Sequence, residues 1–533
     1  MRSRRLDYLT HHIIHPFSAC GMLTMVSTAE KFNNNKIIAS MESLTRLSTN
    51  DIAKHNSPGD CWLVVEDKVW DVTAFAPQHP GGASMILRYA GRDATKAYAE
   101  YHAQGLIEDT LPSSCLKGKL DRSNIDEIWT RSQSSPTNLS SQPAQTQPDH
   151  QKPPLHSIIN SYDFEEAAAR TAPKKAFTFY STAATDCWTR DMNETMYKRI
   201  WFRPRILHDV SRIDTSTTIL RNKVKVPIFI CPTGLAKMIH PEAEKALARA
   251  AKATGIIEVL STSASHPVED IVAEAPDHPF FFQLYVNRDR KKSEELLVKV
   301  NRLGLKAIFV TVDAAGRGKR ESDERLVVDE PVINPVTGER IMPDKKGGGL
   351  TRMMGSYLDE SLSWADLAWI RSLTTLPIVL KGITTAADAK LAMQYGVDGI
   401  LLSNHGGRNL DYSPPAILVL LEMHKLCPEI FERMEVYVDG GIRRGGDIIK
   451  ALCLGATAVG VGRTFLYALN YGSEGAEHLV ELLKDEMESV MKLIGITNVS
   501  ECHPGLVNTL DVDHLVPATD GHPYAKWRPK PRL

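Results

Sequence analysis

Short apolar runs alternate with amphipathic segments throughout the chain from about residue 158 onward. Helical patterns follow most of the apolar runs, for example over Pro241–Thr254 and Thr385–Tyr395. Eight units of strand and helix within ~350 residues predict an α/β fold of the (β/α)8 TIM-barrel type, whose functional groups gather at the carboxyl ends of the strands. A doubly wound sheet is the alternative, but the G-x-G-x-x-G signature after its first strand is absent. The predicted strands are Pro227–Cys231, Ile256–Ser261, Phe280–Tyr285, Ala307–Asp313, Pro377–Lys381, Gly399–Ser403, Val436–Asp439 and Ala458–Gly462.

The 533-residue chain is too long for one ordinary domain, and its composition changes along its length. Near the amino terminus, the runs Trp62–Val65 and Val69–Val72 flank a polar turn, which predicts a β-hairpin. A later stretch is rich in Ser, Gln, Pro and Asn without apolar periodicity, which is typical of a flexible linker. The predicted organisation is a tail or targeting segment over 1–45, a first domain over 46–122, a linker over 123–157, a barrel over 158–515 and a polar tail over 516–533.

Bulk composition excludes several functional classes. The net charge is −1, so the chain as a whole does not attract nucleic acid or an anionic membrane. The eight cysteines include no C-x-x-C pair, which argues against a zinc ribbon or a disulfide scaffold and favours a reducing compartment. No apolar run approaches the ~20 residues that span a bilayer. We therefore expect no nucleic-acid partner and no membrane span.

The amino-terminal segment is basic. Three arginines lie within the first five residues, and Asp7 and Glu30 are the only acidic residues before Glu42. This pattern is compatible with a mitochondrial presequence, and the alternatives are a disordered tail or an extension upstream of a start at Met41. The expected compartment is therefore the mitochondrial intermembrane space or the cytoplasm.

Two histidines in the first unit are candidates for iron ligation. His79 opens the turn His79-Pro80-Gly81-Gly82, and His102 lies 23 positions later, after a predicted helical stretch over Ala83–Tyr98. Two imidazoles on opposing elements can hold one heme iron from both sides, and the glycines allow close approach to the porphyrin. Such an iron has no open position, so it passes electrons instead of binding oxygen. The unit resembles cytochrome b5 from Thr49 to about Leu120, which implies heme b held by His79 and His102.

The turn after the sixth predicted strand carries the strongest catalytic signal. In Ser403-Asn404-His405-Gly406-Gly407-Arg408 a base and a fixed cation lie three positions apart on a Gly-rich turn. A small α-hydroxy acid needs such a pair, because one group anchors its carboxylate and the other takes its proton.

Other strand ends offer groups that suit a flavin. Gln283, Tyr285, Thr311, Asp313 and Lys381 supply amide, hydroxyl, carboxylate and ammonium groups aimed at one centre, and a flavin ring needs hydrogen-bond donors and a cation near N1. Two Gly-rich turns with arginine, over 439–445 and 460–463, close the seventh and eighth predicted strands. Gly-rich backbone plus arginine at consecutive strand ends indicates a phosphate site.

Residues from about 158 to 500 resemble the FMN-dependent α-hydroxy-acid dehydrogenase and oxidase family. With the heme unit in front, the chain is similar to the flavocytochrome branch of that family, the L-lactate:cytochrome c oxidoreductases. The resemblance implies that His405 is the base, held by Asp313, and that Lys381 faces flavin N1. It implies substrate contacts for Tyr285, Arg320, Arg408 and the position of Phe179. Flavin-ring and phosphate contacts are implied for Ser261, Gln283, Thr311, Asp439, Gly441, Arg443, Gly462 and Arg463.

Three positions depart from the family pattern near the substrate. Phe179 replaces a tyrosine that helps to bind the substrate carboxylate, and a hydrogen bond to a charged group is worth about 1.5–3 kcal/mol. Gly234 stands where alanine is common, and Ser263 stands where a bulkier apolar residue is usual. Both changes lead us to expect an acid larger or more polar than lactate. Ala315 and Arg317 also depart from the pattern at the start of the charged stretch 317–356, a candidate lid.

The resemblance implies a relay in which a 2-hydroxy acid is oxidised through FMN and electrons pass to heme b and then to cytochrome c or a similar acceptor. The linker would act as a hinge for the heme unit. The alternatives are a 2-hydroxy-acid oxidase that uses O₂ and a catalytically weak, heme-carrying redox protein. Family members often form homotetramers, which we also expect here.

Overall fold

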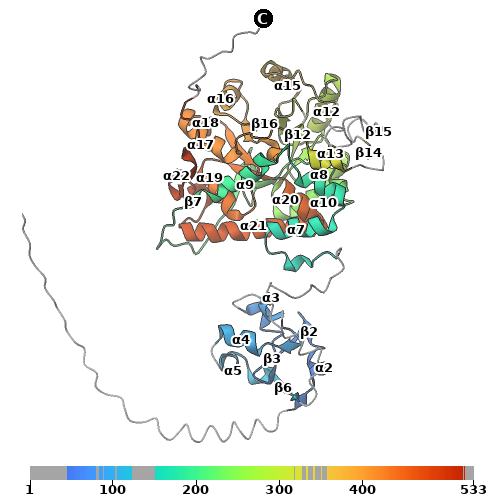
Figure 1. The fold of residues 1–533 in the computed structure, drawn as a ribbon, viewed down its shortest axis with the longest axis vertical. Helices are drawn as coiled ribbons and strands as arrows, with labels where there is room; N and C mark the ends of the chain where they lie inside the picture. Colours follow the sequence, from blue (N-terminus) through green and yellow to red (C-terminus); the bar gives the residue numbers. More distant parts are fainter. Residues whose placement is uncertain are drawn as a thin grey trace, which may run out of the picture. The chain divides into compact units, whose positions relative to one another are not determined.

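The computed structural model describes residues 45–79, 83–87, 89–102, 105–122, 151–316, 318–326, 332–333, 340–341, 350, 357–519 and 521. The predicted targeting segment therefore lies outside the described residues, as do the linker up to residue 150, most of the candidate lid and most of the polar tail. The chain divides into two compact units, with the boundary between Ala144 and Gln145. Figure 1 colours the first unit blue and the second from green to red.

The first unit is a small mixed sheet with short helices. Its strands run in the order β1 (Arg46–Leu47), β6 (Leu116–Leu120), β4 (Lys68–Asp71), β3 (Asp60–Val65) and β2 (Asn56–Ser57). The predicted hairpin is confirmed, since β3 and β4 pair antiparallel with Val65 opposite Lys68. Its turn residues Glu66 and Asp67 have φ values of 51° and 68°, the left-handed pair that matches the twist of a two-residue hairpin.

The predicted continuous helix over Ala83–Tyr98 is wrong. Helix α3 (Ala83–Leu87) ends early, a short strand β5 (Arg92–Asp93) pairs with β3, and α4 (Thr95–Tyr101) begins afterwards. Gly91 makes the break, because its φ of 72° is left-handed and a Cβ there would lie 3.2 Å from backbone atoms of Ala53. The apolar pattern was compatible with a helix, and the pairing of β5 with the sheet decides against it.

The second unit is a closed barrel of eight parallel strands. Each lies within one residue or two of a predicted strand, so the predicted (β/α)8 architecture is confirmed. The strands in barrel order are β10 (Ile228–Ile230), β11 (Ile257–Ser261), β12 (Phe280–Leu284), β13 (Ile308–Thr311), β16 (Ile378–Ile383), β17 (Gly399–Leu402), β18 (Glu435–Asp439) and β19 (Ala458–Val461).

Aromatic side chains fill the inside of the barrel. Phe281 and Phe309 stack with ring centres 5.6 Å apart, and Tyr437 and Phe229 pack beside them, all fully buried. Because this interior is a packed core, the space for a ligand lies at the ends of the strands.

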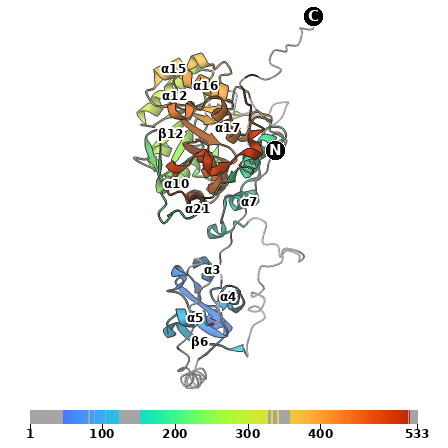
Figure 2. The same ribbon diagram turned by 90° about the vertical axis from the view of Figure 1, so that its left-hand side faces the viewer.

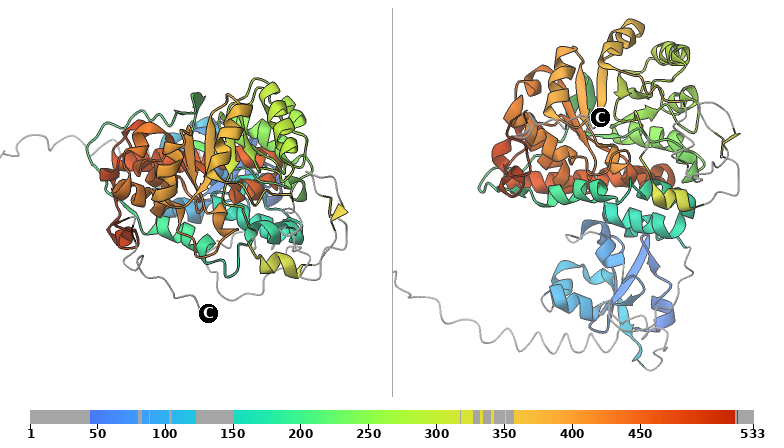
Figure 3. Two further views of the ribbon diagram at one scale, coloured as in Figure 1. Left: turned by 90° about the horizontal axis from the view of Figure 1, so that it is seen from above. Right: turned by 45° about the horizontal axis from the view of Figure 1, so that its top comes forward.

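Helices form the outer layer. The long α21 (Gly472–Ile494) lies against α10 (Ala243–Thr254), α19 (Gly445–Cys453) and α20 (Arg463–Leu469). Figure 2 labels α21 and α10 on the outside of the second unit, and Figure 3 shows helices around its strands in two further views. Helix α21 ends where Gly495 adopts a φ of 73°, a common left-handed C-cap. Among the residues that the structure describes, no helix is long and apolar enough to cross a bilayer.

The chain joins the barrel earlier than residue 158. The Lys152 ammonium donates to the carbonyl of Asn470, and the Tyr471 hydroxyl donates to the carbonyl of Pro153 at 2.9 Å. Residues 155–157 then form a 3-10 turn. The predicted linker is thus joined at Lys152 and Pro153 to the segment between α20 and α21.

Candidate active site

A cavity of about 470 Å³ opens at the carboxyl ends of the barrel strands. Its volume is in the range of small-molecule sites. Asp313 does not line it and instead faces an adjoining cavity of about 400 Å³ behind His405. The other predicted barrel-site residues all line the main cavity: Phe179, Ser261, Gln283, Tyr285, Thr311, Arg320, Lys381, His405, Arg408, Asp439, Gly441, Arg443, Gly462 and Arg463.

His405 lies between a carboxylate and a phenol. Its Nδ1 is 3.0 Å from Oδ1 of Asp313, and its Nε2 is 3.2 Å from the Tyr285 hydroxyl. The Nδ1–H group donates a hydrogen bond to the Asp313 carboxylate. Nε2 is therefore the basic nitrogen, and it faces the cavity. Burial lowers the pKa of His405 more than the neighbouring carboxylate raises it, so the imidazole is neutral at neutral pH.

Asp313 stays ionised although it is buried. Burial alone would raise its pKa, but the Lys381 ammonium and the interaction with His405, including their hydrogen bond, outweigh burial and lower the pKa. The carboxylate reaches this position because residue 382 is glycine. A Cβ on Gly382 would lie 2.5 Å from the Cβ of Asp313, and the φ of 115° there suits only glycine.

Arg408 is fixed by backbone carbonyls. One guanidinium nitrogen donates to the carbonyls of Phe179, Tyr180 and Thr182 at 2.8, 3.0 and 3.2 Å. The guanidinium also lies 5.0 Å from the centre of the Phe179 ring, a cation–π distance. These contacts occupy Nη1 and hold the rest of the guanidinium toward the cavity.

Arg320 adds a second cation beside Phe179. Its Nε donates to the carbonyl of Arg408 at 3.1 Å, and its guanidinium lies 5.9 Å from the Phe179 ring. Burial lowers the pKa of Arg320 to about 10. Burial and the nearby guanidinia of Arg320 and Arg463 lower the pKa of Arg408 as well. Positive charge therefore exceeds negative charge in this part of the cavity.

Lys381 forms a polar bridge at the bottom of the cavity. Its ammonium donates to the Ser403 hydroxyl at 2.9 Å and lies 3.5 Å from Oδ2 of Asp439. Burial opposes its charge, but the carboxylates of Asp439 and Asp313 outweigh burial and raise its pKa, so the ammonium remains charged. Nearby, the Gln283 amide donates to the Thr311 hydroxyl at 2.9 Å and lies beside the Ser261 hydroxyl at 3.4 Å.

The residues present fit FMN. The buried Oδ1 of Asp439 has no hydrogen-bond partner among the described residues, so it can accept from a ribityl hydroxyl. Within the same part of the chain, Arg463 donates only to the carbonyls of Tyr180, Thr182 and Gly406, so its charge is available to a phosphate. A Cβ on Gly441 would clash with the backbone of Asn193, which keeps the loop close to the cavity.

Among the described residues, Arg443, unlike Arg463, is paired with a carboxylate of the protein. It lines the cavity, but its Nη1 pairs with Glu165 at 2.6 Å and its guanidinium lies 4.3 Å from the Tyr162 ring. Arg443 therefore ties the loop after β18 to helix α7 (Ser161–Thr171).

The substrate-side wall contains a pair of hydroxyls. Ser263 lies directly against Gly234, because a Cβ added to Gly234 would be 2.9 Å from the Cβ of Ser263. The Ser263 hydroxyl is 3.1 Å from the hydroxyl of Tyr357, and both side chains are buried. Ser263 therefore occupies the space beside Gly234, so the glycine does not open the room that was expected there, and the two hydroxyls make that wall polar.

His79 and His102 face each other in the first unit, with ring centres 6.0 Å apart. A metal–imidazole bond is about 2 Å and the ring centre lies roughly 1 Å behind the nitrogen, so two rings on one iron have centres roughly 6 Å apart. Nδ1 of His102 lies 3.3 Å from the carbonyl of Tyr98, so Nε2 is the nitrogen that would bind an iron. The spacing fits a heme iron held from both sides, while Pro80, Gly81 and Gly82 lie outside the described residues.

The sequence analysis missed Tyr180, Tyr357 and Asp411. Tyr180 donates its hydroxyl to the carbonyl of Gly234 at 2.8 Å, and its own carbonyl accepts from Arg408 and Arg463. Tyr357 has no motif around it. Asp411 follows His405 by six residues, and its position in that turn was a signal that could have been used.

Comparison with protein families identifies both units. Residues 168–509 match the family model described as FMN-dependent dehydrogenase, and residues 48–121 match the cytochrome b5-like heme/steroid binding domain.

Individual relatives agree with this assignment. The L-lactate dehydrogenase (cytochrome) of Saccharomyces cerevisiae is 40% identical over 486 residues, which cover 90% of this chain and 82% of the yeast protein. Spinach (Spinacia oleracea) glycolate oxidase is 42% identical over 350 residues, or 64% of this chain and 94% of the relative.

Solved structures agree with it as well. The flavin-binding domain of baker's yeast flavocytochrome b2 aligns with a TM-score of 0.62 at 40% identity, over 72% of this chain and 94% of that one. A mandelate oxidase with (S)-4-hydroxymandelic acid aligns with a TM-score of 0.60 at 33% identity, over 66% of this chain and 98% of that one. This chain therefore belongs to the FMN-dependent dehydrogenase family and carries a cytochrome b5-like heme domain in front of the flavin barrel.

Proposed function

We propose that the protein oxidises an L-2-hydroxy acid to the 2-keto acid and delivers the electrons through heme b to cytochrome c or a similar acceptor. The observation that carries this proposal is the neutral imidazole of His405, which lies between Asp313 and Tyr285 at the edge of a cavity that Arg408 also lines. The yeast relative that matches 90% of the chain is named as an L-lactate dehydrogenase of the cytochrome type, which supports the same reaction.

The protein's residues divide the work as follows. Arg408 and Arg320 bind the substrate carboxylate, which also neutralises their excess charge. His405 takes a proton at Nε2 from the substrate Cα or hydroxyl, Asp313 stabilises the resulting imidazolium, and Tyr285 contacts the substrate hydroxyl.

The cofactors complete the reaction. When bound, FMN accepts two electrons from the acid and heme passes them on singly. Lys381 would hold the flavin near N1, with Ser261, Gln283 and Thr311 along the ring. Asp439, Gly441, Gly462 and Arg463 would hold the ribityl chain and phosphate, and Arg443 would support that loop.

We also propose that the preferred acid is larger or more polar than lactate. Ser263 has a small side chain, and the Ser263 and Tyr357 hydroxyls line the cavity and offer hydrogen bonds to the substrate side chain. A structurally similar mandelate oxidase has been solved with (S)-4-hydroxymandelic acid, which has both properties. Burial raises the pKa of Tyr357 to about 12, so its hydroxyl is a neutral hydrogen-bond donor and acceptor.

A substrate panel tests both proposals. Stopped-flow bleaching of the flavin with glycolate, L-lactate, 2-hydroxyoctanoate, L-mandelate and (S)-4-hydroxymandelate gives kcat/KM for each acid. We expect bleaching by several acids and the highest value for one of the larger or more polar members. A clear optimum at L-lactate would refute the second proposal, and no bleaching by any acid would refute the first.

The electron acceptor is tested separately. We expect cytochrome c to be reduced quickly and to suppress peroxide formation in air. A high peroxide yield that cytochrome c does not change would instead support an oxidase, the activity named for the spinach relative.

We further propose that the protein forms a homotetramer. Its proposed compartment is the mitochondrial intermembrane space or the cytoplasm. Exposed apolar side chains support association, since Trp201, Leu207 and Leu510 are 63%, 100% and 76% exposed. Light scattering of the purified full chain would show a monomer if the association proposal is wrong.

A further inference from the structure

Helix α9 (Trp188–Lys198) begins without a cap of its own. The residue before it, Cys187, has a φ of 62° and no side-chain hydrogen bond to the helix. The first N–H groups of a helix have no partner inside the helix, and a buried start without a cap is costly. The partner therefore comes from elsewhere in the chain.

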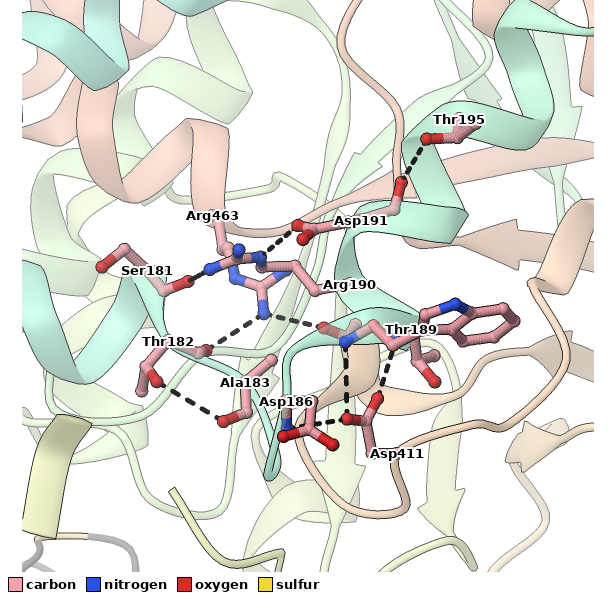
Figure 4. Close-up of polar contacts among 12 residues, drawn as sticks. Ser181, Thr182, Ala183, Asp186, Thr189, Arg190, Asp191, Thr195, Asp411 and Arg463 are labelled. Carbon is pink, nitrogen blue, oxygen red and sulfur yellow. Dashed lines mark hydrogen bonds and ion pairs between the residues drawn. The ribbon is translucent and has the colours of Figure 1, made fainter. Parts of the chain in front are cut away.

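That partner is the carboxylate of Asp411, which is only 8% exposed. Figure 4 shows it below the first turn of α9. Both oxygens accept several hydrogen bonds from the chain. Oδ1 accepts from the backbone N–H groups of Thr189 at 2.8 Å and Tyr412 at 3.1 Å. Oδ2 accepts from the Thr185 hydroxyl at 2.8 Å and from the backbone N–H groups of Asp186 at 3.0 Å and Trp188 at 3.4 Å.

Asp411 is ionised under all ordinary conditions. Burial alone would raise its pKa, but the N–H and O–H donors outweigh burial and lower the pKa to about 2. A charged carboxylate at a helix amino terminus is favourable because it faces the positive end of the helix dipole. The contact is therefore a permanent connection between α9 and the segment that follows His405.

The turn that Asp411 holds is conformationally demanding. His405, Gly406 and Gly407 have φ values of 57°, 63° and 74° in succession, and positive φ is unfavourable for histidine. Gly407 also packs tightly on α9, since a Cβ there would lie 2.6 Å from the backbone nitrogen of Arg190. Such a turn persists only when contacts on both sides determine it.

Contacts on the other side of the turn come from α9 as well. Asn404 and Asn193 exchange two amide hydrogen bonds of 2.8 and 2.7 Å. Asn193 also lies against Gly441 in the loop after β18. Helix α9 thus contacts the turn before His405, through Asn404, and after Arg408, through Asp411.

We propose that Asp411 is a positioning residue, which sets the placement of His405 and Arg408 over the cofactor cavity by capping α9 from outside the helix. Asp411 does not line the cofactor cavity. Its effect passes through the backbone between residues 405 and 411, and small displacements there matter because a misplacement of about 1 Å can cost about a hundredfold in rate. This inference rests on the proposed function of His405 and Arg408.

The test compares the full-length, flavin-loaded protein with its Asp411→Asn variant. Asparagine keeps one acceptor oxygen but presents an NH₂ group to donors on the other side, so it weakens the connection without removing the side chain. We expect unchanged FMN content, a slower flavin reduction by at least tenfold at saturating acid, and a raised KM because Arg408 moves too. Asp411→Ala should be slower still.

Asp186→Asn is the matched control. The Asp186 carboxylate accepts from the exposed Tyr412 hydroxyl at 2.8 Å, in the same surface region, and we expect normal reduction in this variant. A lower melting temperature for Asp411→Asn with a normal rate in the flavin-loaded fraction would overturn the inference, because it would show a merely structural role.

The acid for this test is whichever panel member reduces the wild-type flavin fastest. If no acid reduces the wild type, the proposed function has failed. If the wild type is reduced and Asp411→Asn is equally fast, only the positioning role has failed. The pH profile adds a second readout, since displacement of His405 from Asp313 should move its acid limb to lower pH.

Discussion

The heme unit and the flavin barrel differ in how their functional histidines are held in place. In the heme unit, His79 and His102 come from one short stretch of chain, with a ring-centre spacing of 6.0 Å, and they lie at the ends of the 3-10 helix Ala76–Gln78 and of α4. In the barrel, His405 depends on Asp313, Tyr285 and α9, which lie 92 to more than 200 residues away in sequence. The heme pair is therefore a local motif, whereas the base of the barrel is the product of the whole fold.

The largest expected effect comes from His405→Gln, which removes the base and leaves the cofactor contacts in place. We expect flavin reduction to slow by about a thousandfold or more, in line with general-base catalysis, with FMN content unchanged. Stopped-flow absorbance measures both quantities. His424→Gln is the control, because that imidazole bonds the carbonyl of Leu454 at 2.9 Å, away from the cavity. Unchanged bleaching in His405→Gln would remove this residue from the mechanism.

His79→Ala tests the other side of the comparison. Loss of one of two axial ligands should remove the heme or its low-spin spectrum, so cytochrome c reduction should fall almost to zero. Flavin reduction should stay normal, because the barrel does not use this residue. His55→Ala, which removes an imidazole stacked on Trp62, should change neither reaction. Slower flavin reduction in His79→Ala would show that the two units are not independent.

Asp313→Asn sharpens the account of the barrel. Reduction should slow by about a hundredfold, since the amide holds the imidazole less well and stabilises no positive charge. The Asp313 carboxylate raises the pKa of His405, so its removal lowers that pKa further. In the wild type, kcat/KM should fall as His405 becomes protonated, at a pH below the ordinary range of an imidazole because burial lowers its pKa, and in the variant this acid limb should lie lower still. An acid limb that stays in place would contradict the pairing.

Phe179→Tyr has the smallest expected effect. A phenolic hydroxyl at this position can donate to the substrate carboxylate, so KM should fall by about tenfold with little change in kcat. Phe177→Tyr, on the same helix but packed on Tyr467, is the control. Steady-state kinetics would show equal KM values for Phe179→Tyr and wild type if the carboxylate binds elsewhere.

The comparison also explains what the sequence could predict. Barrel strands such as Gly399–Leu402 and Phe280–Leu284 are continuous apolar runs, so their pattern alone located them. The positions of His405, Arg408 and Lys381 at strand ends then followed from the barrel's geometry. The break at Gly91 could not be seen, because the residues on both sides favour helix and only the pairing of β5 with β3 interrupts it.

The sequence also could not predict contacts between residues far apart in the chain. Asp411 bonds residues at the start of α9 that lie 222 and 223 positions away, and no local pattern encodes that distance. Tyr357 meets Ser263 across 94 positions, next to residues outside the described part of the chain. The pairing of Arg443 with Glu165 was missed for the same reason.

The crowding of Arg320, Arg408 and Arg463 around one cavity has a practical consequence for handling the protein. A barrel emptied of its flavin leaves those guanidinia repelling one another, so buffer anions such as phosphate or sulfate should occupy the space and protect the apoprotein. The same anions would compete with FMN during reconstitution. Loading is therefore best attempted in a buffer of low ionic strength that lacks polyvalent anions.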